Sequence, residues 1–182
     1  MHEEKPEAVR SGVVALQVLG AASLPRAAVR CGEWLTRVAL TMGDLSESSD
    51  TWWASVMLSA HSYYKAHLVM TPLERLDHAV LGLESSVRYG RVRARVSTML
   101  LEALPEDLGA ELVSRKELHP VQILVCVLCT YQPGGGDEKA SLLRTLQVVE
   151  PSTSAVQVVQ VLRAWDAAKR RAEELGVVIP DP

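Results

Sequence analysis

Apolar residues recur along this chain at the three- and four-residue spacing of an α-helix, and no stretch shows the alternation that a strand requires. Within residues 32–45 the spacing includes Trp34, Leu35, Val38 and Met42. Within residues 51–70 it includes Trp53, Val56, Met57, Ala60 and Tyr64. The pattern predicts an all-α protein built from several helices.

Capping residues and helix breakers mark where these helices begin and end. Thr71-Pro-Leu-Glu74 is a capping box with proline at the first helical position. We expect further helices over residues 89–104, 106–113, 120–132, 138–146 and 155–175. Asp137 is the expected cap of the helix over residues 138–146. Ser152–Ser154 are the expected cap of the helix over residues 155–175. The inner stripe expected for the last helix is Ala155, Val158, Leu162, Trp165, Ala172 and Leu175, with Gly176 as its stop.

Two features divide the chain. Gly12–Leu24 is an apolar run preceded by an acidic stretch, which is the opposite charge to that of a secretion signal, so we expect a short helix docked on the body. Pro133–Gly136 is the strongest helix breaker in the sequence and predicts a flexible hinge. The expected organisation is an N-terminal extension helix (1–30), a first helical lobe (31–133) and the start of a second lobe (134–182).

The composition limits the class of protein. Of 182 residues, 48% are apolar and the formal net charge is −3, which disfavours both a disordered chain and a broadly basic nucleic-acid binder. No uninterrupted apolar run reaches the roughly 18–20 residues of a membrane helix, so no membrane association is expected. Three cysteines form no disulfide framework. We therefore expect a reducing, intracellular and cytoplasmic location.

No group of residues has the spacing of a catalytic or metal site. His61 and His67 are six apart and so diverge by about 120° on a helix, unlike a zinc-binding pair four apart. Cys126 and Cys129 have CxxC spacing but lie in an apolar helix with no second pair, which favours core cysteines. We predict no catalytic, cofactor-binding or metal-binding residue, no small-molecule substrate and no enzymatic activity.

The densest basic cluster suggests one alternative function. Arg88, Arg91 and Arg95 fall on one predicted helical face and could contact RNA phosphates. No aromatic stacking platform accompanies them, so a solvated helix face is the simpler interpretation.

Several segments, taken in order, resemble the Gag region of copia-type LTR retrotransposon polyproteins. In the second half these are Leu100–Leu108 (LLEALPEDL), His119–Tyr131 (HPVQILVCVLCTY), Ala140–Leu146 (ASLLRTL) and Ser154–Asp181 with its Gly-Val-Val-Ile-Pro-Asp exit. In the first half they are Gly32–Leu35 (GEWL), Met42–Leu45 (MGDL), Thr51–Trp53 (TWW) and Thr71–Leu76 (TPLERL). Ile123 and Leu124 stand where the family often has tryptophan.

The resemblance implies a capsid-like, non-enzymatic scaffold that associates with itself. The sequence stops where the family continues into its last capsid helices and a zinc knuckle, so we expect an incomplete second lobe. RNA would then be a partner only through regions absent from this chain. Two alternatives remain: a small helical RNA-binding module that uses the Arg88–Arg95 face, and a domesticated Gag-like adaptor that binds a peptide in a groove of one lobe.

Overall fold

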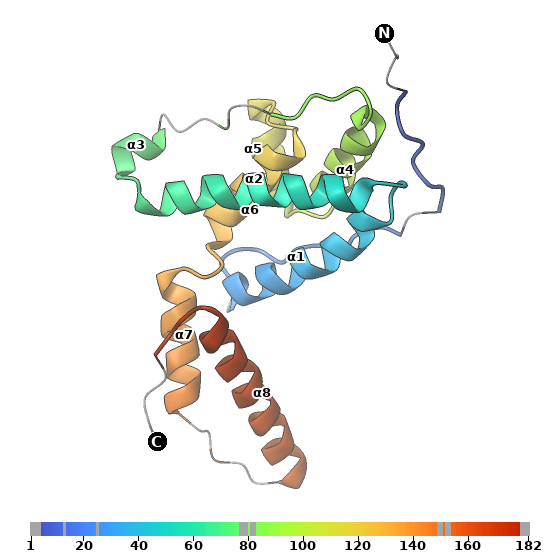
Figure 1. Ribbon diagram of the computed structural model, residues 1–182. Coiled ribbons are helices and arrows are strands. Elements are labelled where there is room, and N and C mark those ends of the chain that lie inside the picture. The colour runs from blue at the N-terminus through green and yellow to red at the C-terminus, as the bar shows by residue number, and fades with distance from the viewer. Residues whose placement is uncertain are drawn as a thin grey trace. The chain divides into compact units, whose positions relative to one another are not determined.

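The computed structural model describes residues 5–12, 14–24, 26–76, 80, 83–148, 151 and 154–178. These residues form helices and connecting segments with no strand among them, which confirms the predicted all-α class. The helices labelled in Figure 1 are α1 (Ala27–Gly43), α2 (Ser49–Val69), α3 (Pro72–Leu76), α4 (Gly90–Glu102), α5 (Glu106–Arg115), α6 (Pro120–Tyr131), α7 (Gly136–Gln147) and α8 (Ala155–Glu174).

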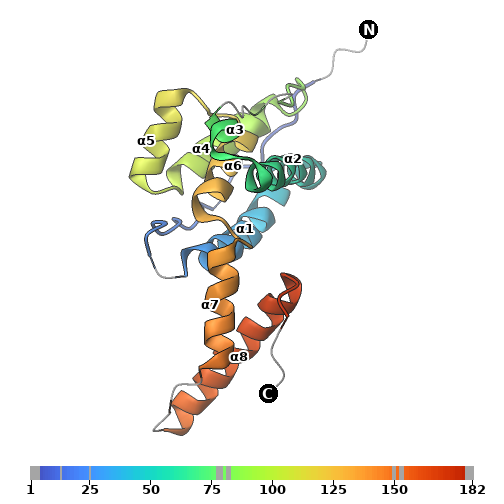
Figure 2. The same cartoon turned by 90° about the vertical axis from the view of Figure 1, so that its left-hand side faces the viewer.

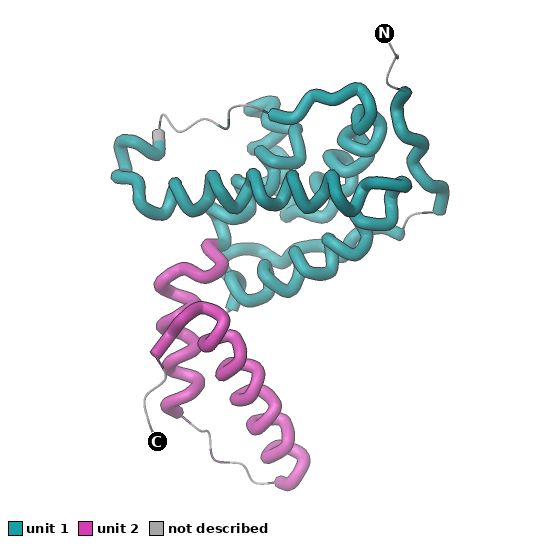
Figure 3. The backbone as a smooth tube through the Cα atoms, viewed as in Figure 1, with its two compact units in different colours: residues 1–131 teal, residues 132–182 magenta. Residues whose placement is uncertain are grey.

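The chain divides into two compact units, residues 1–131 and residues 132–182, which Figure 3 colours separately. We call them unit 1, with helices α1 to α6, and unit 2, with α7 and α8. The proline-glycine run predicted a boundary between residues 133 and 134. The boundary in the structure lies between residues 131 and 132, at the end of α6. That the two units are capsid-like lobes stays a prediction.

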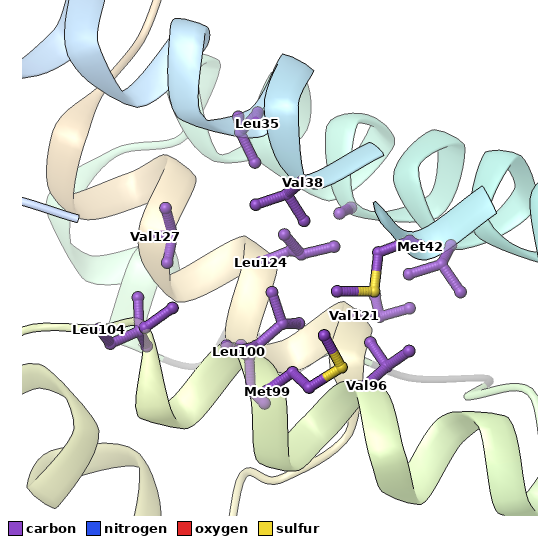
Figure 4. Close-up of a cluster of buried hydrophobic side chains, with 14 of the residues drawn as sticks. Leu35, Val38, Met42, Val96, Met99, Leu100, Leu104, Val121, Leu124 and Val127 are labelled. Atoms are coloured by element: carbon purple, nitrogen blue, oxygen red, sulfur yellow. The ribbon is translucent and has the colours of Figure 1, made fainter. Parts of the chain in front are cut away.

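Helix α6 is the centre of unit 1 because its sequence is apolar on almost every side, and such a helix is stable only when surrounded. It packs against α1, α2 and α4. Figure 2 views α2 nearly along its axis and shows α6 beside it. In Figure 4 the fully buried Leu124 of α6 lies between Val38 of α1 and Leu100 of α4. The predicted inner residues of α1 and α2 are buried, except Met57, which is half-buried.

Three predicted helix ends are confirmed and one is wrong. Thr71 and Glu74 form the capping box, since each backbone N–H donates to the other's side chain. Ser154 accepts from the Gln157 N–H, although its neighbours Ser152 and Thr153 lie outside the described residues. Gly176, at φ 63°, ends α8. Asp137 is not the cap of α7, because the helix already begins at Gly136 with Gly135 before it.

The predicted helix over residues 12–24 is wrong. The described residues of this stretch form a turn at residues 22–23 and otherwise irregular backbone, and α1 begins at Ala27. Short isolated helices are marginal in water and need a buried face. Among the described residues of this stretch, Leu19 alone is buried, while Val14 and Val18 are exposed. Backbone hydrogen bonds to unit 1, described below, replace those of a helix.

Unit 2 is a helical hairpin with a small core. Among the described residues, only Leu142, Ala168 and Ala172 are its buried apolar side chains. The expected inner stripe of α8 is therefore partly wrong: its first three residues (Ala155, Val158, Leu162) are exposed, whereas Trp165 and Leu175 are half-buried and Ala172 is buried. The buried residues of α8, Ala168 and Ala172, lie in its second half and form the small core with Leu142 of α7.

Candidate interaction surfaces

The three arginines of the predicted basic face do not act together. Arg91 and Arg95 are exposed on α4, four residues apart. Arg88 precedes the helix and is committed to Glu7, because its Nε and a terminal nitrogen lie 2.8 and 2.6 Å from Glu7 Oε1. The intervening Arg93 contacts the carboxylate of Glu84 at 3.4 Å. The face that could meet a phosphate backbone is thus reduced to two side chains.

Glu7 is the centre of a polar cluster that joins the N-terminal segment to the rest of unit 1. Its carboxylate accepts from Ser46 Oγ at 2.6 Å, from Ser48 Oγ at 2.5 Å and from the Ser48 N–H at 3.3 Å. The Tyr89 hydroxyl lies 3.0 Å from Ser48 Oγ, and the Arg88 guanidinium lies over the Tyr89 ring. The hydrogen bonds from Ser46 and Ser48, with that from Arg88, lower the pKa of Glu7 to about 2.

The same N-terminal segment, residues 5–24, continues along unit 1 through main-chain contacts. We call it the strap. Its amides at Glu7, Arg10 and Leu19 donate to the carbonyls of Arg88, Leu45 and Ala103 at 2.7–2.8 Å. Near its end, Gly20 and Gln17 offer their carbonyls to the Tyr131 hydroxyl at 2.6 Å and to Trp34 Nε1 at 2.7 Å. Because residue 10 lies by residue 45 and residue 17 by residue 34, the strap runs antiparallel to α1 (Figure 1).

A second surface is the exposed face at the start of α8. Ala155, Val158, Val159 and Leu162 have the i, i+3, i+4, i+7 spacing of one helix face, and all four are exposed. Leu162 is 60% and Val159 47% exposed. A groove of about 460 Å³ lies between α7 and α8, lined by Ser141, Arg144, Thr145, Val148, Val161, Ala164 and Trp165. We call the four-residue surface the α8 face.

Sequence reasoning missed both the strap contacts and the α8 face. The α8 face left a detectable signal: residues 155–162 carry no charge and include five apolar side chains besides Ala155, more than one stripe against a single neighbouring helix can bury. The strap left none, because its ion pair joins residues far apart in the sequence.

The cysteines and histidines do not form a reactive constellation in the described part of the chain. Burial raises the pKa of the Cys126 thiol, and it raises that of Cys129 to about 11, so both are protonated near neutrality. His61 Nδ1 lies 2.9 Å from the carbonyl of Met57, within its own helix. The described residues hold no group of three or more potential metal ligands.

The ion pair between Glu138 and Arg171 in unit 2 has a structural role. The side chain of Glu138 is completely buried and accepts from Arg171 Nε at 2.8 Å, and the Gly134 N–H donates to its other oxygen at 2.5 Å. The hydrogen bond to Glu138 is also the main reason that the pKa of Arg171 is raised. Glu138 thereby ties the proline-glycine turn to both helices of the hairpin.

A comparison of the chain with models of protein families, with curated proteins and with solved structures finds no match in any of the three. Among the described helices, none combines the length and apolar character needed to cross a bilayer.

Proposed function

We propose that this chain is a non-enzymatic, Gag-like structural protein whose work is to associate with copies of itself. One observation carries the proposal: the α8 face exposes four apolar residues on a hairpin whose described residues bury only three apolar side chains. Units with so small a core usually need a staple or an oligomer. The sequence resemblance to copia-type Gag supports the same function.

The chemistry of the α8 face suits a second copy. Residues 155–162 carry no charge, so pairing two identical faces brings no like charges together there. Fully burying a valine or leucine contributes about 1.5–3 kcal/mol, and these side chains are already about half covered. Covering them on two copies therefore yields several kcal/mol, against an association cost of about 4–15 kcal/mol. Weak, concentration-dependent association is the expected result.

Light scattering over a concentration series, with and without nuclease, tests this function. We expect a monomer when dilute and larger species at high concentration, unchanged by nuclease. Leu162→Asp should abolish the larger species, because it places a charge on the α8 face at a side chain that is 60% exposed. Gln160→Asp is the matched control, since Gln160 is exposed on another side of α8. A strict monomer at every concentration contradicts the proposal.

RNA binding is the competing function, and the same material tests it. Arg91 and Arg95 are exposed on one side of α4, which is the observation in its favour. RNA binding through them should weaken steeply with salt and fall in the Arg91→Ala/Arg95→Ala variant. Self-association that persists in this variant and after nuclease treatment favours the scaffold over the RNA-binding module.

A further inference from the structure

The strap is held on the rest of unit 1 as a peptide is held on its receptor. It uses an acidic side chain in a polar pocket, one buried leucine and main-chain hydrogen bonds. The pocket consists of Ser46, Ser48 and Arg88 around the Glu7 carboxylate. Leu19 is 3% exposed and belongs to the main core cluster of unit 1. None of these contacts depends on how the strap is joined to α1.

The attachment of the strap is modest in extent. Besides Leu19, Val9 and Leu16 are half-buried against the core of unit 1, whereas Val14, Val18 and Leu24 are 77%, 63% and 44% exposed. One buried leucine contributes about 1.5–3 kcal/mol, and a typical hydrogen bond about 0.5–1.5 kcal/mol net. Local opening of such a segment costs less than unfolding the unit to which it is bound.

The connection between the strap and α1 contains a strained residue. Arg26, directly before the helix, has φ 59° and ψ 27°, in the left-handed region that side-chain-bearing residues adopt at a cost. A short, strained connection favours exchange of the preceding segment between copies, because opening the connection relieves the strain.

We propose that the strap exchanges between copies, so that residues 5–24 of one chain occupy the strap-binding surface of a second chain. The exchanged pair keeps the Glu7–Arg88 ion pair, the buried Leu19 and the hydrogen bonds to Ala103 and Tyr131. The proposal rests on self-association for its partner, a second copy of this chain, but it uses a surface in unit 1 rather than the α8 face.

The concentration dependence of the exchange follows from its geometry. A tethered strap competes for its own site at an effective concentration of the order of millimolar. A dilute chain therefore keeps its own strap, and exchange becomes favourable where copies are crowded, as they are once the α8 face has gathered them. The strap then links neighbours without creating any contact that the single chain lacks.

A charge-reversal mixture tests the exchange. In the Glu7→Arg chain two cations meet at the pocket, and in the Arg88→Glu chain two carboxylates meet, so each strap binds its own site more weakly. Mixing the two chains restores opposite charges at both sites only when the straps cross. The double variant Glu7→Arg/Arg88→Glu restores the pair within one chain and is the matched control. All chains carry Leu162→Asp, which removes association through the α8 face.

Sedimentation velocity, with one of the two chains fluorescently labelled, measures whether the chains are monomers or dimers. We expect each single variant to sediment as a monomer, the double variant as a monomer with a restored melting temperature, and the equimolar mixture as a dimer. If the double variant regains its melting temperature but the equimolar mixture stays monomeric, the exchange is overturned. It leaves the proposed function intact, because that function is tested by the association of chains without Leu162→Asp.

A peptide of residues 5–24 gives a second test that does not depend on the reversed charges. It is added to the full-length Leu19→Asp chain, whose own strap is weakened at its buried position. We expect the peptide to raise the melting temperature, a Leu19→Asp peptide to bind at least tenfold more weakly, and a Val18→Asp peptide to bind like the original. Equal behaviour of the three peptides overturns the proposal, even where the reversed pair does not restore the fold.

Discussion

At the residue scale, the most informative single side chain is Glu7. Glu7→Gln retains the shape of the side chain but removes the charge that Ser46, Ser48 and Arg88 surround. We expect a loss of about 1 kcal/mol of unfolding free energy at neutral pH, the usual size for such a hydrogen-bonded and partly exposed ion pair. Thermal melting measures the loss, and Glu47→Gln, at an exposed neighbouring carboxylate, is the control with no expected effect.

The pH dependence of this loss has a definite sign. The pKa of Glu7 is lowered from 4.5 to about 2 in the folded chain, so its contribution is present above the ordinary carboxyl pKa. It is lost as the pH falls from about 4.5 to about 2, where the folded carboxylate also becomes protonated. The difference in stability between the wild type and Glu7→Gln should therefore shrink through this window. A difference that stays constant from pH 7 to pH 2 contradicts the cluster described here.

The glycine turn gives a matched pair of substitutions. A Cβ on Gly135 meets the Gln132 carbonyl oxygen at 2.8 Å, whereas a Cβ on Gly136 has no atom within 4 Å. Gly135→Ala should cost about 1–3 kcal/mol through this overlap. Gly136→Ala, at the first residue of α7, should be neutral or stabilise by about 0.4–1 kcal/mol. Chemical denaturation measures the unfolding free energy of both variants. Equal effects of the two substitutions would support the predicted flexible hinge instead of an ordered turn.

At the element scale, Trp165 reports how completely α8 is packed. Its ring is half-buried, and its Nε1 donates to the Leu146 carbonyl at 3.3 Å. A fully buried tryptophan costs about 3–5 kcal/mol when replaced by alanine. We expect about 1–2 kcal/mol for Trp165→Ala in unit 2, and less for Trp165→Phe, measured by the melting of α8 at dilute concentration. A loss in the range of a full core position would show that the hairpin is better packed than its burial indicates.

The helices were predictable where one local pattern decides them. The spacing in α1 and α2 and the capping box at Thr71–Glu74 follow from neighbours within a few residues, and the structure confirms them. The helix expected over 12–24 failed because an apolar run specifies burial but not the backbone conformation that achieves it. Hydrogen bonds from Leu19 to Ala103 and from Tyr131 to Gly20 determine that conformation, and they span more than 80 residues.

The candidate surfaces were predictable only in part, for the same reason. Arg91 and Arg95 lie where helical spacing placed them, exposed on α4. Arg88 lies before the helix and is paired with Glu7, 81 positions away, which no local pattern reveals. The apolar residues of α8 were recognised correctly, but which of them would face α7 depends on the length and position of that partner helix.

At the scale of the whole molecule, the two units should differ in how readily they open. Unit 1 has an extensive core around α6, whereas the described residues of unit 2 bury three apolar side chains. Regions with few buried apolar contacts open locally at a lower free energy. We therefore expect amides in α6 to exchange with solvent at least tenfold more slowly than those in the second half of α7 and the first half of α8. Native-state hydrogen exchange on the full chain measures both units in one sample.

Concentration should then separate the units further. If copies associate through the α8 face, the amides of residues 159–165 should become more protected as the chain is concentrated, while those of residues 121–131 should not change. The reason is that mass action stabilises only the unit whose folded surface enters the contact. Leu162→Asp should remove this dependence, and Gln160→Asp should retain it. Protection that rises equally in both units, or in neither, contradicts association through the α8 face.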